Sequence, residues 1–163
     1  MADESAVEKP DEGISLSAPV IMDLIEAVHE KGASFRFQAR GFSMTPAIRD
    51  GDVITVSPLG SGRPRRGDVL AFRHPLRPQL LVHRVLQARG MKYFIRGDSC
   101  PEADGWLLLE NVIGIVTRVE RNKKSVFWPD RDHAWSRFYF CLYTLWPPLR
   151  RFLVRTSAFF KHC

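Results

Sequence analysis

From residue 34 the apolar pattern changes to a period of two, with alternation over residues 34–39, and short apolar segments separated by glycine- and proline-rich turns follow up to residue 119. Successive side chains of a β-strand point to opposite faces, so this period of two predicts half-buried strands. We expect strands at residues 34–39, 53–56, 69–72, 80–86, 93–95 and 112–119, the last of which closes the sheet. Short strands with frequent turns are typical of a compact, mainly antiparallel β domain.

The sequence on either side of these strands differs in character. Residues 1–13 are acidic and polar and predict a disordered leader, whereas residues 14–32 predict an amphipathic helix. Ser17 can cap this helix and Gly32 can end it. Its expected apolar face holds Val20, Ile21, Leu24, Ile25 and Val28, and its polar face holds Asp23, Glu26 and His29. The β domain then spans residues 33–122, and residues 123–163 form an aromatic and basic C-terminal extension.

The net charge of +6 lies in the C-terminal part of the chain. Residues 118–163 carry ten Lys/Arg and three Asp/Glu, a net +7, while the preceding residues sum to −1. Within it, residues 138–161 mix aromatic side chains with arginines, a composition that suits contact with a membrane surface. The alternative is that these aromatics pack on the β domain and cover a sheet edge. No nucleic-acid-binding motif is present, so we do not expect a nucleic-acid partner.

The cysteines and the N-terminal residues indicate the compartment. Three cysteines without metal-type spacing argue against a disulfide framework and favour a reducing environment. The acidic leader does not resemble a secretory signal, and no run of 18 apolar residues predicts a transmembrane helix. We therefore expect a cytoplasmic protein, with peripheral membrane contact left open, that uses no cofactor and no metal.

Four short segments combine the residue types of a nucleophilic hydrolase: residues 41–46, 50–52 and 82–85, and Gly97-Asp98 followed by Asp104. A serine hydroxyl is a weak nucleophile and needs a nearby base, a role that histidine fills at neutral pH. A carboxylate then fixes the tautomer of the histidine. Ser43 is the candidate nucleophile, His83 the base, and Asp104 or Asp98 the acid. His29, His74, His133 and His162 lack such a context and are predicted to be surface residues.

These motifs, taken in order, resemble a known peptidase clan. Gly-x-Ser-Met-x-Pro, Asp-Gly-Asp-Val, Arg-Gly-Asp-Val-Leu-Ala-Phe, Val-His-Arg-Val, Arg-Gly-Asp and Ile-Gly-Ile-Val resemble the signal peptidase I and LexA-type (S24/S26-like) serine peptidases over roughly residues 35–119. Bacterial signal peptidases and LexA-type proteins use lysine as the base. Histidine at position 83, with acidic residues six apart at 98 and 104, is similar to the archaeal and endoplasmic-reticulum signal peptidases.

The resemblance implies the clan's β fold and a set of roles. Ser43 would be the nucleophile, His83 the base and Asp104 the third member, while Asp98 would support the loop or the histidine. Two features depart from signal peptidases. Gly41-Phe42 replaces the usual Ser-Gly before the nucleophile, so an oxyanion hole would depend on backbone amides, including that of Ser43. The predicted helix at 18–31 carries charges where signal peptidases have a transmembrane helix.

Three functions remain open at this point. The leading one is a serine endopeptidase that cleaves a peptide or preprotein held in an extended conformation beside the active-site strand. The second is a regulator that cuts itself, as LexA-type proteins do, although their usual Ala-Gly or Cys-Gly cleavage dipeptide does not occur here. The third is a pseudoenzyme that binds peptides without cutting them.

Overall fold

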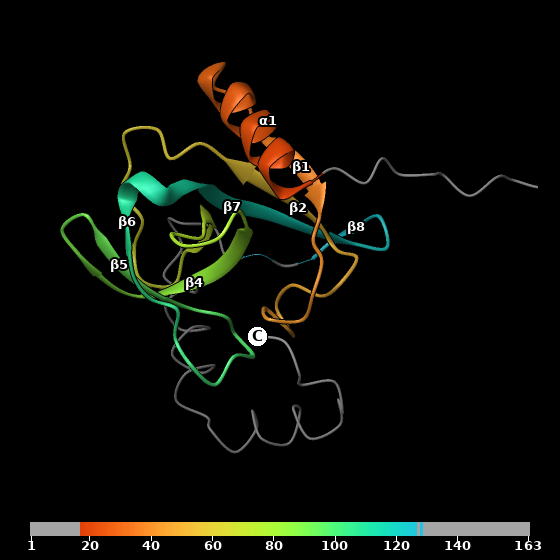
Figure 1. Cartoon of the computed structure of the whole chain (residues 1–163). Helices are drawn as coiled ribbons and strands as arrows, with labels where there is room; N and C mark the ends of the chain where they lie inside the picture. The colour runs from red at the N-terminus through yellow and green to blue at the C-terminus, as the bar shows by residue number, and fades with distance from the viewer. Residues whose placement is uncertain (1–16, 127, 129–163) are drawn as a thin grey trace, which may run out of the picture.

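The computed structural model describes residues 17–126 and residue 128, and these form one helix and an eight-stranded sheet (Figure 1). In chain order the elements are α1 (Ala18–Glu30), β1 (Phe35–Gln38), β2 (Val53–Ser57), β3 (Val69–Arg73), β4 (Leu80–Arg89), β5 (Lys92–Arg96), β6 (Gly105–Leu108), the 3-10 turn η1 (Leu109–Asn111), β7 (Val112–Arg121) and β8 (Lys124–Ser125). The predicted fold class, mainly antiparallel β with an N-terminal helix, is confirmed.

The sheet has the strand order β1-β2-β7-β3-β4-β5-β6, with β8 paired to β7, and every pairing is antiparallel. The expectation that the strand at 112–119 closes the sheet is wrong, because β7 lies between β2 and β3. Two strands were missed. β6 reads as an unbroken apolar run after its glycine, and β8 is two residues long. Asn122 and Lys123, both at positive φ, form the turn before β8.

The core lies on both faces of the sheet. β3 is buried along four successive residues, and its alternate side chains enter two separate clusters. Val69 and Ala71 join one cluster, which also contains Met44 and Ile48 from the loop after β1. Leu70 and Phe72 join the other, together with side chains of β4, β5, β6 and β7. The loop that contains Ser43 is therefore anchored by its own apolar side chains in the core.

Helix α1 packs through a face that overlaps the predicted one only in part, at Ile25 and at the half-buried Ile21 and Val28. Met22 and Ile25 are its buried residues, whereas Val20 and Leu24 are 43% and 40% exposed. Ser17 occupies the N-cap position but its side chain makes no capping hydrogen bond, and Gly32 follows the helix at a φ of +70°. His29 also faces the sheet. The helix therefore docks through residues 22, 25 and 29, which lie about one helical turn apart on the same face.

Two histidines that were expected on the surface are half-buried. His29 lies on the sheet, with Nδ1 3.1 Å from the carbonyl oxygen of Ile113 and Nε2 3.1 Å from that of Val56. A neutral imidazole can donate to only one of the two. His74 accepts a hydrogen bond from the amide of Leu76 in the turn before β4.

Several expectations fall outside the described residues. These are the leader at 1–13, the aromatic and basic segment at 138–161, and His133 and His162. Where the structure is described, no helix has the length and apolar character needed to cross a bilayer.

Candidate active site

The loop between β1 and β2 carries Ser43 in a tightly bonded turn. The amide of Thr45 donates to the carbonyl of Phe42, and the amide of Ile48 donates to that of Met44. The segment thus contains a single helical turn. Gly41 begins it at a φ of +93°, a conformation that favours glycine, and its amide donates to the side chain of Asp50.

The turns on either side of β2 share one construction. Arg49-Asp50-Gly51-Asp52 and Arg65-Arg66-Gly67-Asp68 have the same pattern, and in each the arginine amide donates to the aspartate Oδ2 at 2.8 Å. The aspartate amide returns a bond of 3.1 Å to the arginine carbonyl, and the glycine has a positive φ. These two Gly-Asp pairs are turn-forming residues, as local turn chemistry predicts.

His83 lies on β4 opposite Leu70 of β3 and is 5% exposed. Its ring centroid is 6.0 Å from that of Phe72. Because an interior strand supplies the imidazole, its position is set by the sheet and not by a mobile loop.

Ser43, His83 and Asp104 form one continuous hydrogen-bonded set. Ser43 Oγ lies 2.9 Å from His83 Nε2, and His83 Nδ1 lies 2.8 Å from Asp104 Oδ2. When the ring proton is on Nδ1 and is donated to the carboxylate, Nε2 is left as the acceptor for the serine hydroxyl. The three side chains come from the loop after β1, from β4 and from the loop before β6, so only the fold brings them together.

Asp98 is paired with a different residue. Arg84 donates from Nε to Asp98 Oδ1 at 2.8 Å and from Nη2 to Oδ2 at 2.6 Å, and its Nη1 donates to the carbonyl of Gly67 at 2.9 Å. Both partners are buried, at 9% and 5% exposure. This bidentate pair ties β4 to the loop at 97–104. Sequence reasoning missed the role of Arg84, although an arginine beside the histidine in an apolar strand signals a buried acidic partner.

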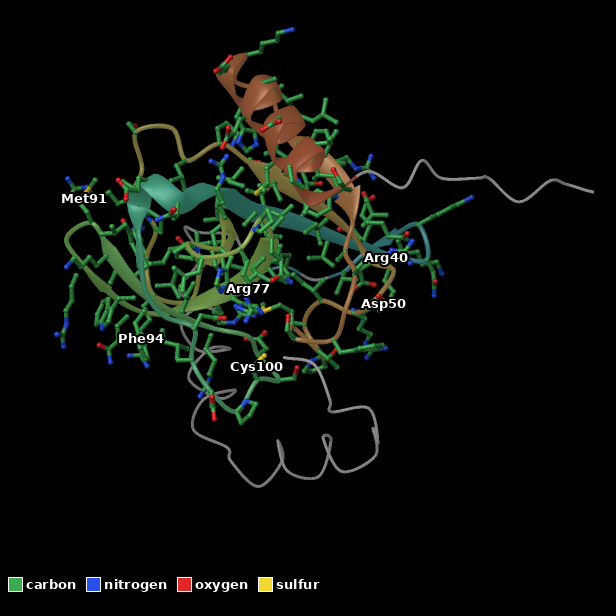
Figure 2. All side chains as sticks on the ribbon, in the orientation of Figure 1. Arg40, Asp50, Arg77, Met91, Phe94 and Cys100 are labelled. Atoms are coloured by element: carbon green, nitrogen blue, oxygen red, sulfur yellow. The ribbon has the colours of Figure 1, made fainter. Side chains whose placement is uncertain are left out.

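The loop at 97–104 packs directly on the turn that holds Ser43. The Ser99 amide donates to the Ser43 carbonyl at 2.8 Å, and the Ser99 hydroxyl donates to the Phe42 carbonyl at 2.6 Å. A Cβ on Gly97 would lie 2.6 Å from Cys100 Sγ, 2.8 Å from Ser43 O and 3.1 Å from His83 Nε2. Figure 2 shows Cys100 and Asp50, which belong to these two loops, on the side of the sheet away from α1. No sequence signal identified Ser99.

A second ion pair fixes the other end of the Ser43 loop. Arg121 of β7 donates from Nε and Nη2 to the two carboxylate oxygens of Asp52, at 2.9 and 2.7 Å. Burial raises the pKa of Asp52, but the hydrogen bonds from Arg121 and from the Arg49 amide outweigh it, so that its pKa is lowered overall. The hydrogen bond to Asp52 in turn raises the pKa of Arg121. Both groups are therefore charged at neutral pH.

Two backbone amides of the turn have no hydrogen-bond partner among the described residues. Within residues 17–126 and 128, no hydrogen bond is formed by the N–H of Ser43 or of Met44. A hydroxyl, its base, an orienting carboxylate and unbonded amides next to the hydroxyl are the parts needed for nucleophilic attack on a carbonyl carbon. The arrangement contains no group of three metal-ligating side chains in the described part of the chain.

Comparison with known proteins identifies a family for this chain. The family model described as Peptidase S24-like matches residues 2–98, more than half of the chain. The match includes Ser43, His83 and Asp98 and ends before Asp104. A search of curated proteins found no match to the chain. The length of the family match shows that this chain belongs to the Peptidase S24-like family.

Proposed function

We propose that this protein is a serine endopeptidase in which Ser43 is the nucleophile, His83 is the general base and Asp104 orients the imidazole. The observation that supports the proposal is the unbroken set of hydrogen bonds from Ser43 Oγ through His83 to Asp104, 2.9 and 2.8 Å long. Both distances suit proton transfer and tautomer control without rearrangement.

The proposed reaction follows from these contacts. Ser43 Oγ attacks the carbonyl carbon of the scissile peptide bond while His83 Nε2 accepts the hydroxyl proton. Asp104 keeps the other ring proton on Nδ1 and stabilises the imidazolium. The carbon–nitrogen bond then breaks, and the departing amine takes the proton from Nε2. A water molecule, deprotonated by the same nitrogen, hydrolyses the acyl-enzyme and restores the Ser43 hydroxyl.

The negative charge on the substrate oxygen needs donors, and the chain offers backbone amides for this role. Gly41 stands where signal peptidases have a serine hydroxyl, and neither it nor Phe42, which is 62% exposed, has a hydroxyl to contribute. The N–H of Ser43, which forms no hydrogen bond among the described residues, is the donor that we assign to the oxyanion hole.

An extended peptide is the substrate form that the sheet favours. Among the described strands, β1 pairs with β2 alone, so its other edge offers unpaired backbone groups. The chain runs from the end of β1 at Gln38 to Ser43 within five residues, which brings a peptide added to that edge toward the nucleophile. A preprotein cleaved near its N-terminus would present such a segment. This matches the resemblance of His83, Asp98 and Asp104 to the histidine-type signal peptidases.

The proposal is tested by cleavage that depends on Ser43. Wild-type protein is incubated with a proteome-derived peptide library, and new termini are identified by mass spectrometry. We expect Ser43→Ala to remove all cleavage while retaining the fold, and Ser57→Ala, which changes a hydroxyl at the far end of β2, to cleave as wild type does. Equal cleavage by the Ser43→Ala variant would exclude the assignment.

Membership of the Peptidase S24-like family favours a second candidate, in which the same site cuts its own chain, as LexA-type proteins do. Purified protein would then release an N-terminal fragment at a rate independent of protein concentration, and Ser43→Ala would release none. A rate that rises with concentration identifies cleavage between molecules and supports the endopeptidase instead.

A further inference from the structure

We propose that Ser99 is a positioning residue, which holds the backbone of the Ser43 turn so that its amides can stabilise the oxyanion. This inference rests on the proposed function, because it assigns a role in the same reaction. Ser99 contacts the turn through two donors, its hydroxyl on the carbonyl of Phe42 at 2.6 Å and its amide on the carbonyl of Ser43 at 2.8 Å. No other residue among those described donates to both of these carbonyls.

The two contacted carbonyls belong to the two peptide units that flank Ser43. A trans peptide unit is planar, and its C=O and N–H point in opposite directions. A donor that fixes the Phe42 carbonyl therefore fixes the direction of the Ser43 N–H, which points away from Ser99. By the same geometry, the bond to the Ser43 carbonyl fixes the direction of the Met44 N–H. Ser99 thus sets the orientation of both unbonded amides without contacting the substrate.

The position of Ser99 is itself firmly held. The residue before it is Asp98, whose carboxylate is bound bidentately by Arg84. The amide of Cys100, the residue after it, donates to the carbonyl of Gly97. The buried ion pair therefore transmits the rigidity of β4, the strand that carries His83, to the residue that supports the nucleophile turn. One loop positions both Asp104 against the base and the backbone beside the nucleophile.

The Ser99 hydroxyl shares its task with one other donor. The Thr45 amide also donates to the Phe42 carbonyl, at 3.0 Å, and the Ser99 amide persists after substitution of the side chain. Loss of the hydroxyl should therefore cost less than the ~10²–10³-fold loss in rate caused by removing an oxyanion donor outright. We expect a decrease of about tenfold, which is below that range.

The test uses a fluorophosphonate probe, because it reacts at an activated serine without knowledge of the substrate. Ser43 Oγ forms a bond to phosphorus, the phosphorus–fluorine bond breaks, fluoride leaves, and His83 accepts the hydroxyl proton. Three variants are compared with wild type. Ser99→Thr keeps a hydroxyl, and Ser99→Val has the shape of threonine without the hydroxyl. Thr117→Val removes a hydroxyl from β7 and serves as the matched control. Thermal unfolding of each variant verifies that the fold is retained.

We expect Ser99→Val to be labelled about tenfold more slowly than wild type, as argued from the oxyanion range, with Ser99→Thr and Thr117→Val close to wild type. The labelling rate is also measured as a function of pH. In Ser99→Val the pH at half-maximal labelling should be unchanged, because the Ser43–His83 pair is left intact, and only the maximal labelling rate should fall. Wild-type labelling of Ser99→Val, or equal slowing of Ser99→Thr, would overturn the role of Ser99. Absence of Ser43-dependent labelling in the wild type would instead overturn the proposed function, and the two failures are thereby distinguished.

Discussion

Asp98 binds the guanidinium of Arg84 through both carboxylate oxygens, while Asp104, six residues later in the same loop, binds the imidazole of His83. The two acidic residues therefore have separate partners on neighbouring positions of β4. Because adjacent side chains of a strand point to opposite faces, His83 and Arg84 cannot share one carboxylate. The loop at 97–104 supplies one acid to each of these two side chains, so the structural ion pair and the candidate catalytic set use separate carboxylates.

Asp98→Asn should destabilise the fold strongly. It leaves the buried guanidinium of Arg84 without its counter-charge, and breaking one partner of a buried pair typically costs about 3–5 kcal/mol. The free energy of unfolding, measured by urea denaturation, should fall by that order, whereas the exposed residue Glu102 of the same loop, changed to Gln, should alter it little. Equal stability of the Asp98→Asn and Glu102→Gln proteins would contradict the structural role of the pair.

Asp104→Asn should have the opposite profile, with the fold retained and the reaction slowed. The Asp104 side chain is 27% exposed, so the loss of its carboxylate leaves no buried charge unpaired. The backbone N–H of residue 104 still donates to the carbonyl of Ile95. An asparagine can hold the imidazole in the wrong tautomer, an effect that reaches about 10⁴-fold in rate in a serine protease triad. The measurement is the rate of fluorophosphonate labelling at constant stability. A labelling rate equal to that of wild type would remove Asp104 from the mechanism.

Asp52 should make the stability of the protein depend on pH in the acid range. Its pKa in the folded state is lowered from the ordinary 3.8, so folding favours the carboxylate over the protonated form. The stabilising contribution is therefore present above pH 3.8 and is lost as the pH falls below it, through the folded pKa. The difference in unfolding free energy between wild type and Asp52→Asn should shrink across that window. In an Arg121→Met background the difference should lose most of its pH dependence, and persistence of the full dependence would rule out Arg121 as its cause.

The elements that were predictable from the sequence are those set by local pattern. Short apolar segments separated by glycine- and proline-rich turns located six strands, because both the apolar runs and the turn residues are local features of the sequence. Ser43 and His83 could be predicted as a candidate nucleophile and base, because few residue types can fill these two roles. Their juxtaposition could only be expected, since residues 40 positions apart meet through the pairing of β3, β4 and β7.

What the sequence left open depends on tertiary contacts. β7 is a central strand because it pairs with β2 on one edge and with β3 on the other. The residues of β7 alone do not encode which strands pair with it. The docking face of α1 was predicted only in part, because His29, polar in any hydropathy pattern, contacts carbonyls of the sheet. The residues alone also left the choice between Asp98 and Asp104 open, although the resemblance favoured Asp104, because the choice depends on the directions in which His83 and Arg84 leave β4.

Gly97→Ala should slow the reaction through steric pressure on the site. The added Cβ would meet Cys100 Sγ at 2.6 Å, the Ser43 carbonyl oxygen at 2.8 Å and His83 Nε2 at 3.1 Å, all closer than ordinary van der Waals contact. A thiol can move, so Cys100→Ala should relieve the first of these contacts. The backbone carbonyl and the imidazole are held by the sheet and the turn, so the double variant should recover only part of the labelling rate.

Gly114→Ala provides the matched control, since its Cβ would meet His29 and the β2 backbone at 2.7 Å. That variant should lower the unfolding temperature without changing the labelling rate of the folded protein. Full recovery in the Gly97→Ala/Cys100→Ala protein would show that the Ser43 turn yields freely, against the rigid support inferred from Ser99.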